Sequence, residues 1–146
     1  MTNLEERYAV NQLIARFANN FDLKAWDDLR DCLTESVYTD YSALRGTPPE
    51  TLTGNQFVEL RRQALQHLKT HHLAANYEIN ITDNQGDARV SMVIYRKNET
   101  GDVLNTHCLY LFGVKKMNHT WRIFSIVQKV FWSDGNTKLH QGINRE

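Results

Sequence analysis

Hydrophobic residues in the first half of the chain recur at steps of three and four, the spacing of amphipathic helices. Residues 4–21 and the shorter segment 24–33 each place their apolar side chains on one face. A further helix begins at the capping-box sequence Thr53-Gly54-Asn55-Gln56 and extends to about Leu68. The pattern therefore predicts three helices, each covering one side of a larger element.

From Thr70 onward, the period changes from helical to alternating, as in β-strands. Short turn sequences rich in Asn, Gly and Asp divide this half of the chain into strands at 70–83, 86–98, 103–117 and 120–133. An earlier strand is predicted at 35–42, ahead of a loop with the only prolines. These later strands exceed the usual five or six residues, which indicates a strongly curved sheet.

Helices followed by a meandering antiparallel sheet are typical of the α+β class. We predict a cone-shaped α+β barrel in which three N-terminal helices pack inside a curved, mostly antiparallel sheet, with a pocket in the interior. Residues 1–146 are expected to form a single domain, with a core at about 4–135 and a polar tail at 136–146. Apolar residues on both parities of 103–117 suggest that the outer sheet face is covered by a second subunit, in a homodimer or higher homo-oligomer.

Composition narrows the range of partners. The 17 basic and 17 acidic residues give no net charge, so we expect neither nucleic acid nor membrane as a partner. Cys32 and Cys108 lie far apart in apolar runs, which predicts reduced core thiols in a cytoplasmic protein. No apolar run is long enough for a signal peptide or a membrane span.

Two adjacent histidines, His71 and His72, open the strand at 70–83. Histidine titrates close to neutral pH, so this pair is a candidate for acid–base chemistry. Strict alternation groups His71 with Tyr77 and Ile79, and groups His72 with Asn76 and Glu78. Because both sheet faces are expected to be covered, alternation alone does not decide which histidine faces the pocket.

Four short sequences carry a resemblance to a known family: Phe21-Asp22-Leu23-Lys24-Ala25-Trp26-Asp27-Asp28-Leu29, His72-Leu73-Ala74-Ala75-Asn76, Gly86-Asp87-Ala88 and His119-Thr120-Trp121-Arg122-Ile123. In this order and spacing, the chain resembles the SnoaL-like and scytalone dehydratase-like branch of the nuclear transport factor 2-like superfamily. The resemblance covers about residues 4–135. It implies a cone-shaped α+β barrel around an apolar pocket, often in a homodimer.

The resemblance also implies a set of site residues. In scytalone dehydratase-like enzymes, an Asp after the first helix hydrogen-bonds a His at the start of the second strand, and a second His and two Tyr line the pocket. These catalytic positions correspond to Asp22, His72, His107 and either Tyr38 or Tyr41. The residue before Asp22, a Tyr in that enzyme, is Phe21 here, which argues against the same substrate. The expected ligand contacts are Phe21, Asp40, His71, Asn76 and Trp132.

Such a set has a plausible chemistry. A neutral imidazole can take a proton next to a carbonyl and return one to a leaving hydroxyl, while a carboxylate fixes its tautomer. Tyrosine phenols can polarise the carbonyl. The sequence therefore predicts a lyase or isomerase, dehydratase- or cyclase-like, acting on a small apolar polycyclic or aromatic carbonyl compound without metal or organic cofactor.

Other interpretations stay open because this fold hosts several functions. The chain could be a non-catalytic ligand-binding or subunit-like module whose pocket is filled by side chains. A ketosteroid isomerase-like proton shift could use Asp40 as base, although 103–117 and 120–133 contain no acidic partner. An epoxide hydrolase would need an Asp-Arg-Asp set, for which Arg89 and Arg96 are available. A metal site is not favoured, since no two of the histidines and Asp22 have close helical spacing.

Overall fold

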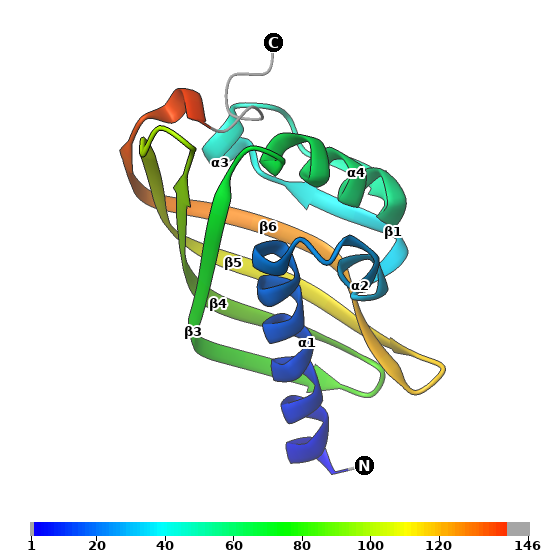
Figure 1. Cartoon of the computed structure of the whole chain (residues 1–146). Coiled ribbons are helices and arrows are strands. Elements are labelled where there is room, and N and C mark those ends of the chain that lie inside the picture. The colour runs from blue at the N-terminus through cyan, green and yellow to red at the C-terminus, as the bar shows by residue number, and fades with distance from the viewer. Residues whose placement is uncertain (1, 140–146) are drawn as a thin grey trace.

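The computed structural model describes residues 2–139 (Figure 1). The helices are α1 (Asn3–Leu23), α2 (Trp26–Asp31), α3 (Ser42–Arg45) and α4 (Gly54–Leu65). The strands are β1 (Leu33–Asp40), β2 (Glu50–Thr53), β3 (Lys69–Thr82), β4 (Gln85–Lys97), β5 (Val103–Met117) and β6 (Thr120–Gly135). A single 3₁₀ turn, Thr137–Leu139, follows β6.

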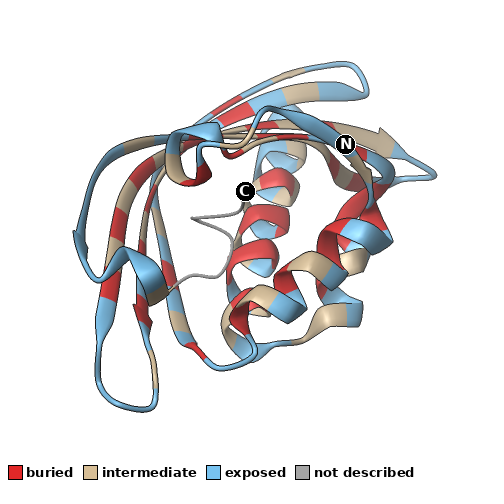
Figure 2. Ribbon diagram, turned by 90° about the horizontal axis from the view of Figure 1, so that it is seen from above, coloured by how far each residue is buried: buried red, intermediate tan, exposed pale blue. Residues whose placement is uncertain are grey.

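The strands form one six-stranded sheet in the order β2-β1-β6-β5-β4-β3. All neighbouring strands are antiparallel except β1 and β6, which are parallel. The sheet curves around α1, and the helices lie on its concave side (Figure 2). This arrangement confirms the predicted α+β cone. The barrel does not close, because the two edge strands β2 and β3 do not pair with each other.

Local sequence explains where α1 begins and ends. Thr2 caps the helix by accepting a hydrogen bond from the Glu5 N–H, and the Glu5 carboxylate accepts one from the Thr2 N–H. The helix ends at Leu23 and is followed by the C-cap Lys24, which adopts the left-handed conformation with φ 53°. The helix is therefore longer than the predicted 4–21, and Asp22 lies in its last turn.

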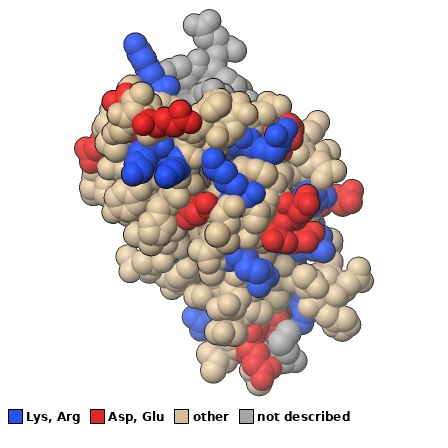
Figure 3. Space-filling view, viewed as in Figure 1, with Lys and Arg blue, Asp and Glu red and all other residues tan. Residues whose placement is uncertain are grey.

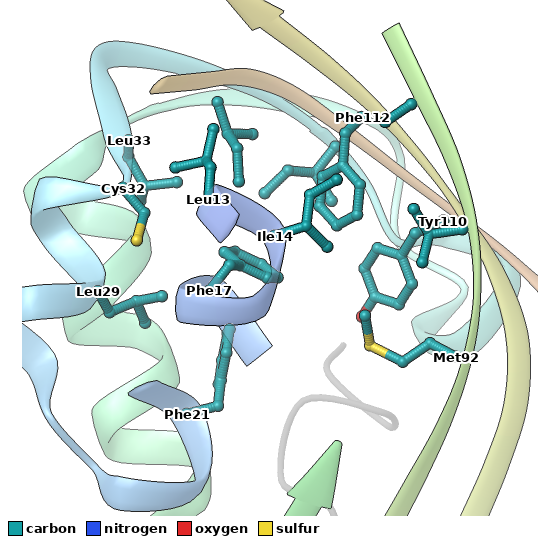
Figure 4. Close-up of a cluster of buried hydrophobic side chains, with 14 of the residues drawn as sticks. Leu13, Ile14, Phe17, Phe21, Leu29, Cys32, Leu33, Met92, Tyr110 and Phe112 are labelled. Atoms are coloured by element: carbon teal, nitrogen blue, oxygen red, sulfur yellow. The ribbon is translucent and has the colours of Figure 1, made fainter. Parts of the chain in front are cut away.

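Phe17 is at the centre of the core, fully buried between the helices and the sheet. Its ring packs edge-on against Phe21 and Phe112, with centroid distances of 5.1 and 5.4 Å (Figure 4). The sheet contributes the even-numbered residues of β4 and β5, because alternate side chains of these strands point toward α1. Cys32 and Cys108 are both free and buried, as expected.

Lysine, arginine and acidic side chains are interspersed on the face seen in Figure 3. This mixture agrees with the zero formal net charge of the chain. Among the described residues, no helix is long and apolar enough to cross a membrane.

The structure differs from the sequence prediction between residues 33 and 53. The first strand begins at Leu33 and ends at Asp40, and Tyr41 is then the N-cap of α3 instead of continuing the strand. After the proline-containing loop, the four residues of β2 pair with β1. Both α3 and β2 were missed because elements of four residues are too short to show a period.

A β-bulge in β3 separates residues that strict alternation would group together. The pairing with β4 shifts between Ala75 and Glu78, and Asn76 at this point has φ 55°. His72 therefore shares the concave face with Tyr77 and Ile79, not with Asn76 and Glu78. The grouping based on alternation is wrong across the bulge.

The bulge can be tested by substitution of Asn76. Asn76→Val should lower the free energy of unfolding by about 1–2 kcal/mol, because a β-branched residue is strained at positive φ. Asn76→Gly should change it by less than about 0.5 kcal/mol. Asn80→Val, on the same strand outside the bulge, is the matched control. Urea unfolding measures all three variants, and wild-type stability of Asn76→Val would argue against the bulge.

Candidate active site

Buried His72 and half-buried Asp22 form a hydrogen-bonded pair between α1 and β3. The distance from His72 Nδ1 to Asp22 Oδ1 is 2.7 Å. Asp22 Oδ2 accepts a second hydrogen bond from the His72 backbone N–H at 2.7 Å, and Oδ1 accepts one from Thr70 Oγ1 at 2.9 Å. These three donors offset the repulsion between a carboxylate and the negative end of helix α1.

Packing fixes the orientation of the His72 ring. Phe21, one residue before Asp22, stacks on the imidazole with a centroid distance of 4.9 Å. Because Nδ1 is held by Asp22, Nε2 is the nitrogen that remains for other partners. Burial lowers the pKa of His72, the Asp22 carboxylate opposes this shift, and the positive charge of Arg96 adds to it. His72 is therefore a neutral base at pH 7, oriented by a carboxylate.

The His72 ring lines a small cavity inside the cone. The cavity has a volume of about 20 Å³, enough for about one water molecule. Its wall combines residues from α1, α3, α4 and four strands. Beside His72, the wall includes Phe21, Tyr41, Arg61, Arg96, Tyr110 and Gln128. Most of these groups are polar, so this is not the purely apolar pocket that the resemblance implies.

Two tyrosines border the cavity. The guanidinium groups of Arg45 and Arg61 each lie over the buried ring of Tyr41, 4.6 Å from its centroid. Tyr110 Oη accepts a hydrogen bond from Gln128 Nε2 at 3.3 Å. Burial raises the pKa of Tyr110 well above its ordinary value, so the phenol is a neutral hydrogen-bond donor. Tyr110 was missed, although Cys108, Tyr110 and Phe112 share the buried parity of β5.

Arg61 and Arg96 also face the cavity, and neither has a carboxylate partner among the described residues. Arg61 and Arg96 are each 4% exposed. Arg96 Nη1 donates to Thr106 Oγ1 at 2.8 Å, whereas Arg61 lies over the rings of Tyr41 and Phe57. Within residues 2–139, neither arginine forms an ion pair. Burial lowers the pKa of Arg96 to about 10, which still leaves it charged at neutral pH.

The burial of these two arginines could have been predicted from their positions in the sequence pattern. Arg96 continues the buried row of Ala88, Val90, Met92 and Ile94 on β4. Arg61 lies four residues after Phe57 and four before Leu65, on the buried face of α4. An arginine at such a position is informative, because a charged side chain is rarely buried without a partner. By contrast, Arg89 is exposed and pairs with Glu78 on the outer side of the sheet.

The structure does not bring His107 to the Asp22–His72 pair. Odd-numbered residues of β5 point to the outer face, and His107 stacks there on Trp132 with a centroid distance of 4.2 Å. Its Nε2 lies 4.0 Å from Asp134 Oδ2. Trp132 is 54% exposed and donates its Nε1–H to Asp134. The prediction that His107 and Trp132 line the pocket is therefore wrong.

Four other candidates also lie away from the cavity. Tyr38 points outward from β1 and is 41% exposed, and His71 is exposed beside Tyr95. Asn76 is exposed at the bulge. The Asp40 carboxylate accepts hydrogen bonds from the Ser42 hydroxyl and N–H at the start of α3, and these bonds lower its pKa. Asp40 is thus an ionised turn residue, unlike a base in an apolar pocket.

The described part of the chain contains no group of three or more His, Cys, Asp or Glu side chains that could hold a metal ion. The hydrogen-bonding capacity of Asp22 is already directed to Thr70 and His72. The chemistry open to the site is therefore proton transfer by His72 beside hydrogen-bond donors and guanidinium groups.

Comparison with known proteins places this geometry in a family. The family model of the SnoaL-like domain matches residues 2–127, and the chain belongs to this family. It shares the cone fold of the nuclear transport factor 2-like superfamily, as the resemblance implied. A search of functionally curated proteins finds no match.

Several solved structures share the fold at low sequence identity. Protein Kfla4162 from Kribbella flavida superimposes with a TM-score of 0.90 at 19% identity, over 94% of this chain and 98% of that one. A proposed scytalone dehydratase from Novosphingobium aromaticivorans gives a TM-score of 0.82 at 13% identity, over 92% and 89%. Hexachlorocyclohexane dehydrochlorinase LinA-type3 from Novosphingobium barchaimii gives 0.78 at 10% identity, over 94% of each chain. At these identities, the similarity establishes the fold alone.

The influence of Arg96 on His72 can be measured directly. Arg96→Gln should raise the pKa of His72, because it removes a positive charge that disfavours the imidazolium. Arg89→Gln removes an exposed arginine of the same strand and should leave the His72 pKa unchanged. NMR titration of the His72 ring signals provides the measurement. Equal His72 pKa values in the two variants would contradict the described placement of Arg96.

Proposed function

We propose that the protein is a cofactor-independent lyase or isomerase that acts on a small carbonyl compound by proton transfer at His72. The observation that supports this proposal is the 2.7 Å contact between Asp22 Oδ1 and His72 Nδ1, on a histidine that is buried and lines a cavity. Family membership and the fold shared with a proposed scytalone dehydratase and a dehydrochlorinase agree with such chemistry.

In this mechanism, Nε2 of neutral His72 removes a proton from the carbon next to the substrate carbonyl. Asp22 stabilises the imidazolium that forms, and it keeps the proton on Nδ1 in the resting state. The phenols of Tyr41 and Tyr110 donate hydrogen bonds to the developing enolate oxygen. The imidazolium then returns its proton to a leaving hydroxyl, which gives dehydration, or to another carbon, which gives isomerisation.

Proton abstraction can be tested before the natural substrate is known. Wild-type protein in D₂O should exchange the α-protons of one or more members of a panel of cyclic and aromatic ketones, followed by ¹H NMR. His72→Ala should slow this exchange by about 10²–10⁴-fold, because it removes the general base. His71→Ala is the matched control and should retain the wild-type rate. Equal exchange rates in the two variants would refute the role of His72.

A second candidate function is supported by the small size of the cavity. A volume of about 20 Å³ is far below that of a typical ligand pocket. A non-catalytic, subunit-like module of the same fold would keep its interior filled by side chains in this way. The polar lining and the short Asp22–His72 contact favour catalysis instead, and failure of wild-type protein to exchange any ketone in the panel would favour the non-catalytic module.

We also propose that the outer sheet face binds a second copy of the chain. A row of paired residues crosses four strands on this face: Leu73, Val93, His107 and Trp132. Leu73 is 47% and Trp132 54% exposed, so the row presents apolar surface to the outside. The absence of net charge limits repulsion between copies. The two free thiols agree with the expected reducing, cytoplasmic compartment.

Sedimentation velocity tests this self-association. Wild-type protein should sediment as a dimer or higher oligomer, and Leu73→Lys should shift it toward monomer by placing a charge in the contact. Tyr8→Lys changes an exposed aromatic residue on α1, away from the outer sheet face, and should leave the assembly unchanged. Monomeric wild-type protein would contradict the proposal.

A further inference from the structure

The cavity beside His72 has an excess of positive charge. Arg61 and Arg96 are buried at its wall and form no ion pair within residues 2–139. Burial lowers the pKa of Arg96, and the nearby positive charge of Arg61 adds to this shift. Two guanidinium groups buried together are costly for the folded chain unless an anion accompanies them.

Within residues 2–139, the groups around the cavity do not supply this anion. Both oxygens of Asp22 already accept hydrogen bonds from Thr70 or His72. Burial raises the pKa of the Cys108 thiol to about 11, and it raises that of Tyr110 well above its ordinary value. Both groups are therefore neutral at pH 7, and the partner of the two arginines must come from outside the set of described residues.

An unsatisfied acceptor lies at the same cavity. Gln128 is 1% exposed, and its Nε2 donates to Tyr110 Oη at 3.3 Å. Its Oε1 is buried and has no hydrogen-bond partner among the described residues. A buried carbonyl oxygen without a donor is unfavourable, so this atom is suited to accept a hydrogen bond from a ligand hydroxyl.

We infer that the site binds a small hydroxy-carboxylate. Its carboxylate would lie between Arg61 and Arg96, and its hydroxyl would donate a hydrogen bond to Gln128 Oε1. This inference rests on the proposed function for its connection to catalysis, since it names the substrate class of the same site. A planar carboxylate presents two oxygens, which suits two guanidinium groups. The carboxylate would hold the rest of the molecule beside His72, where the proton is transferred.

The cavity volume sets a condition on this binding. About 20 Å³ accommodates one water but not a complete organic acid. The bound state therefore needs displacement of wall side chains, and the long flexible side chains of Arg61 and Arg96 can move to grip the carboxylate. Binding should consequently be selective for charge and hydrogen bonding more than for a preformed shape.

Glycolate, acetate and glycolamide are suitable probes. Glycolate has both the carboxylate and the hydroxyl, acetate lacks the hydroxyl, and glycolamide lacks the charge. Chemical-shift titration at pH 7, with sodium chloride as the salt control, should show saturable binding in the order glycolate, acetate, glycolamide. Equal responses to glycolate and glycolamide, or to glycolate and chloride, would overturn the inference.

Matched variants localise the binding. Arg61→Gln and Arg96→Gln should each weaken glycolate binding at least tenfold. Arg62→Gln, the exposed neighbour on α4, and Arg89→Gln, the exposed arginine on β4, should change it less than twofold. If one buried variant does not fold, the other still decides the outcome. Unchanged glycolate affinity in a folded Arg61 or Arg96 variant would overturn the inference.

Two further variants separate this inference from the proposed function. Gln128→Leu should abolish the preference for glycolate over acetate, and a retained preference would remove Gln128 from the subsite. His72→Ala should still bind glycolate, because the arginines remain. Glycolate binding by a wild type that exchanges the α-protons of neither the ketones nor a keto-carboxylate would retain the anion subsite and reject the base. Exchange without glycolate binding would reject the subsite alone.

Discussion

The hydrogen bonds between Asp22 and the start of β3 are the constraint on which both the packing of α1 and the candidate site depend. One carboxylate accepts from the His72 ring, the His72 backbone and Thr70, so it joins the end of the central helix to an edge strand. Each partner alone would be unfavourable: a carboxylate at the negative end of a helix, and a buried imidazole without a partner. Together they fix the direction of α1 inside the cone.

The interior of the cone is divided by polarity along its length. Around Phe17 it is an apolar core, in which aromatic rings meet edge to face. Beyond Phe21, whose ring stacks on His72, the walls carry arginines, tyrosines and a glutamine. Phe21 belongs to both regions. Hydrophobic burial of the first region can offset the cost of keeping charged groups in the second, which is how a fold retains a destabilising site.

Periodicity predicts most of this architecture, because long helices and strands repeat their burial pattern many times. It fails where local geometry interrupts the repeat. The bulge at Asn76 reverses the alternation of β3, and β2 and α3 each have only four residues. The link between Asp22 and His72 was expected from the family resemblance, not from periodicity. The position of His107 could not be predicted in this way. Both the odd-numbered and the even-numbered residues of β5 include apolar side chains, so the sequence did not show which set faces the interior.

The buried arginines show what a sequence can reveal when polar residues are examined in their burial pattern. Arg96 lies on the same face of β4 as four buried apolar residues, and Arg61 lies on the buried face of α4. The chain as a whole nevertheless has no net charge. A balanced total charge therefore does not reveal that two of the positive charges are buried in the interior. Since replacing such groups by apolar residues commonly stabilises a protein, their burial is better explained by a ligand than by folding. If the inferred anion subsite is correct, the charge of the bound molecule is the property that this interior specifies most directly.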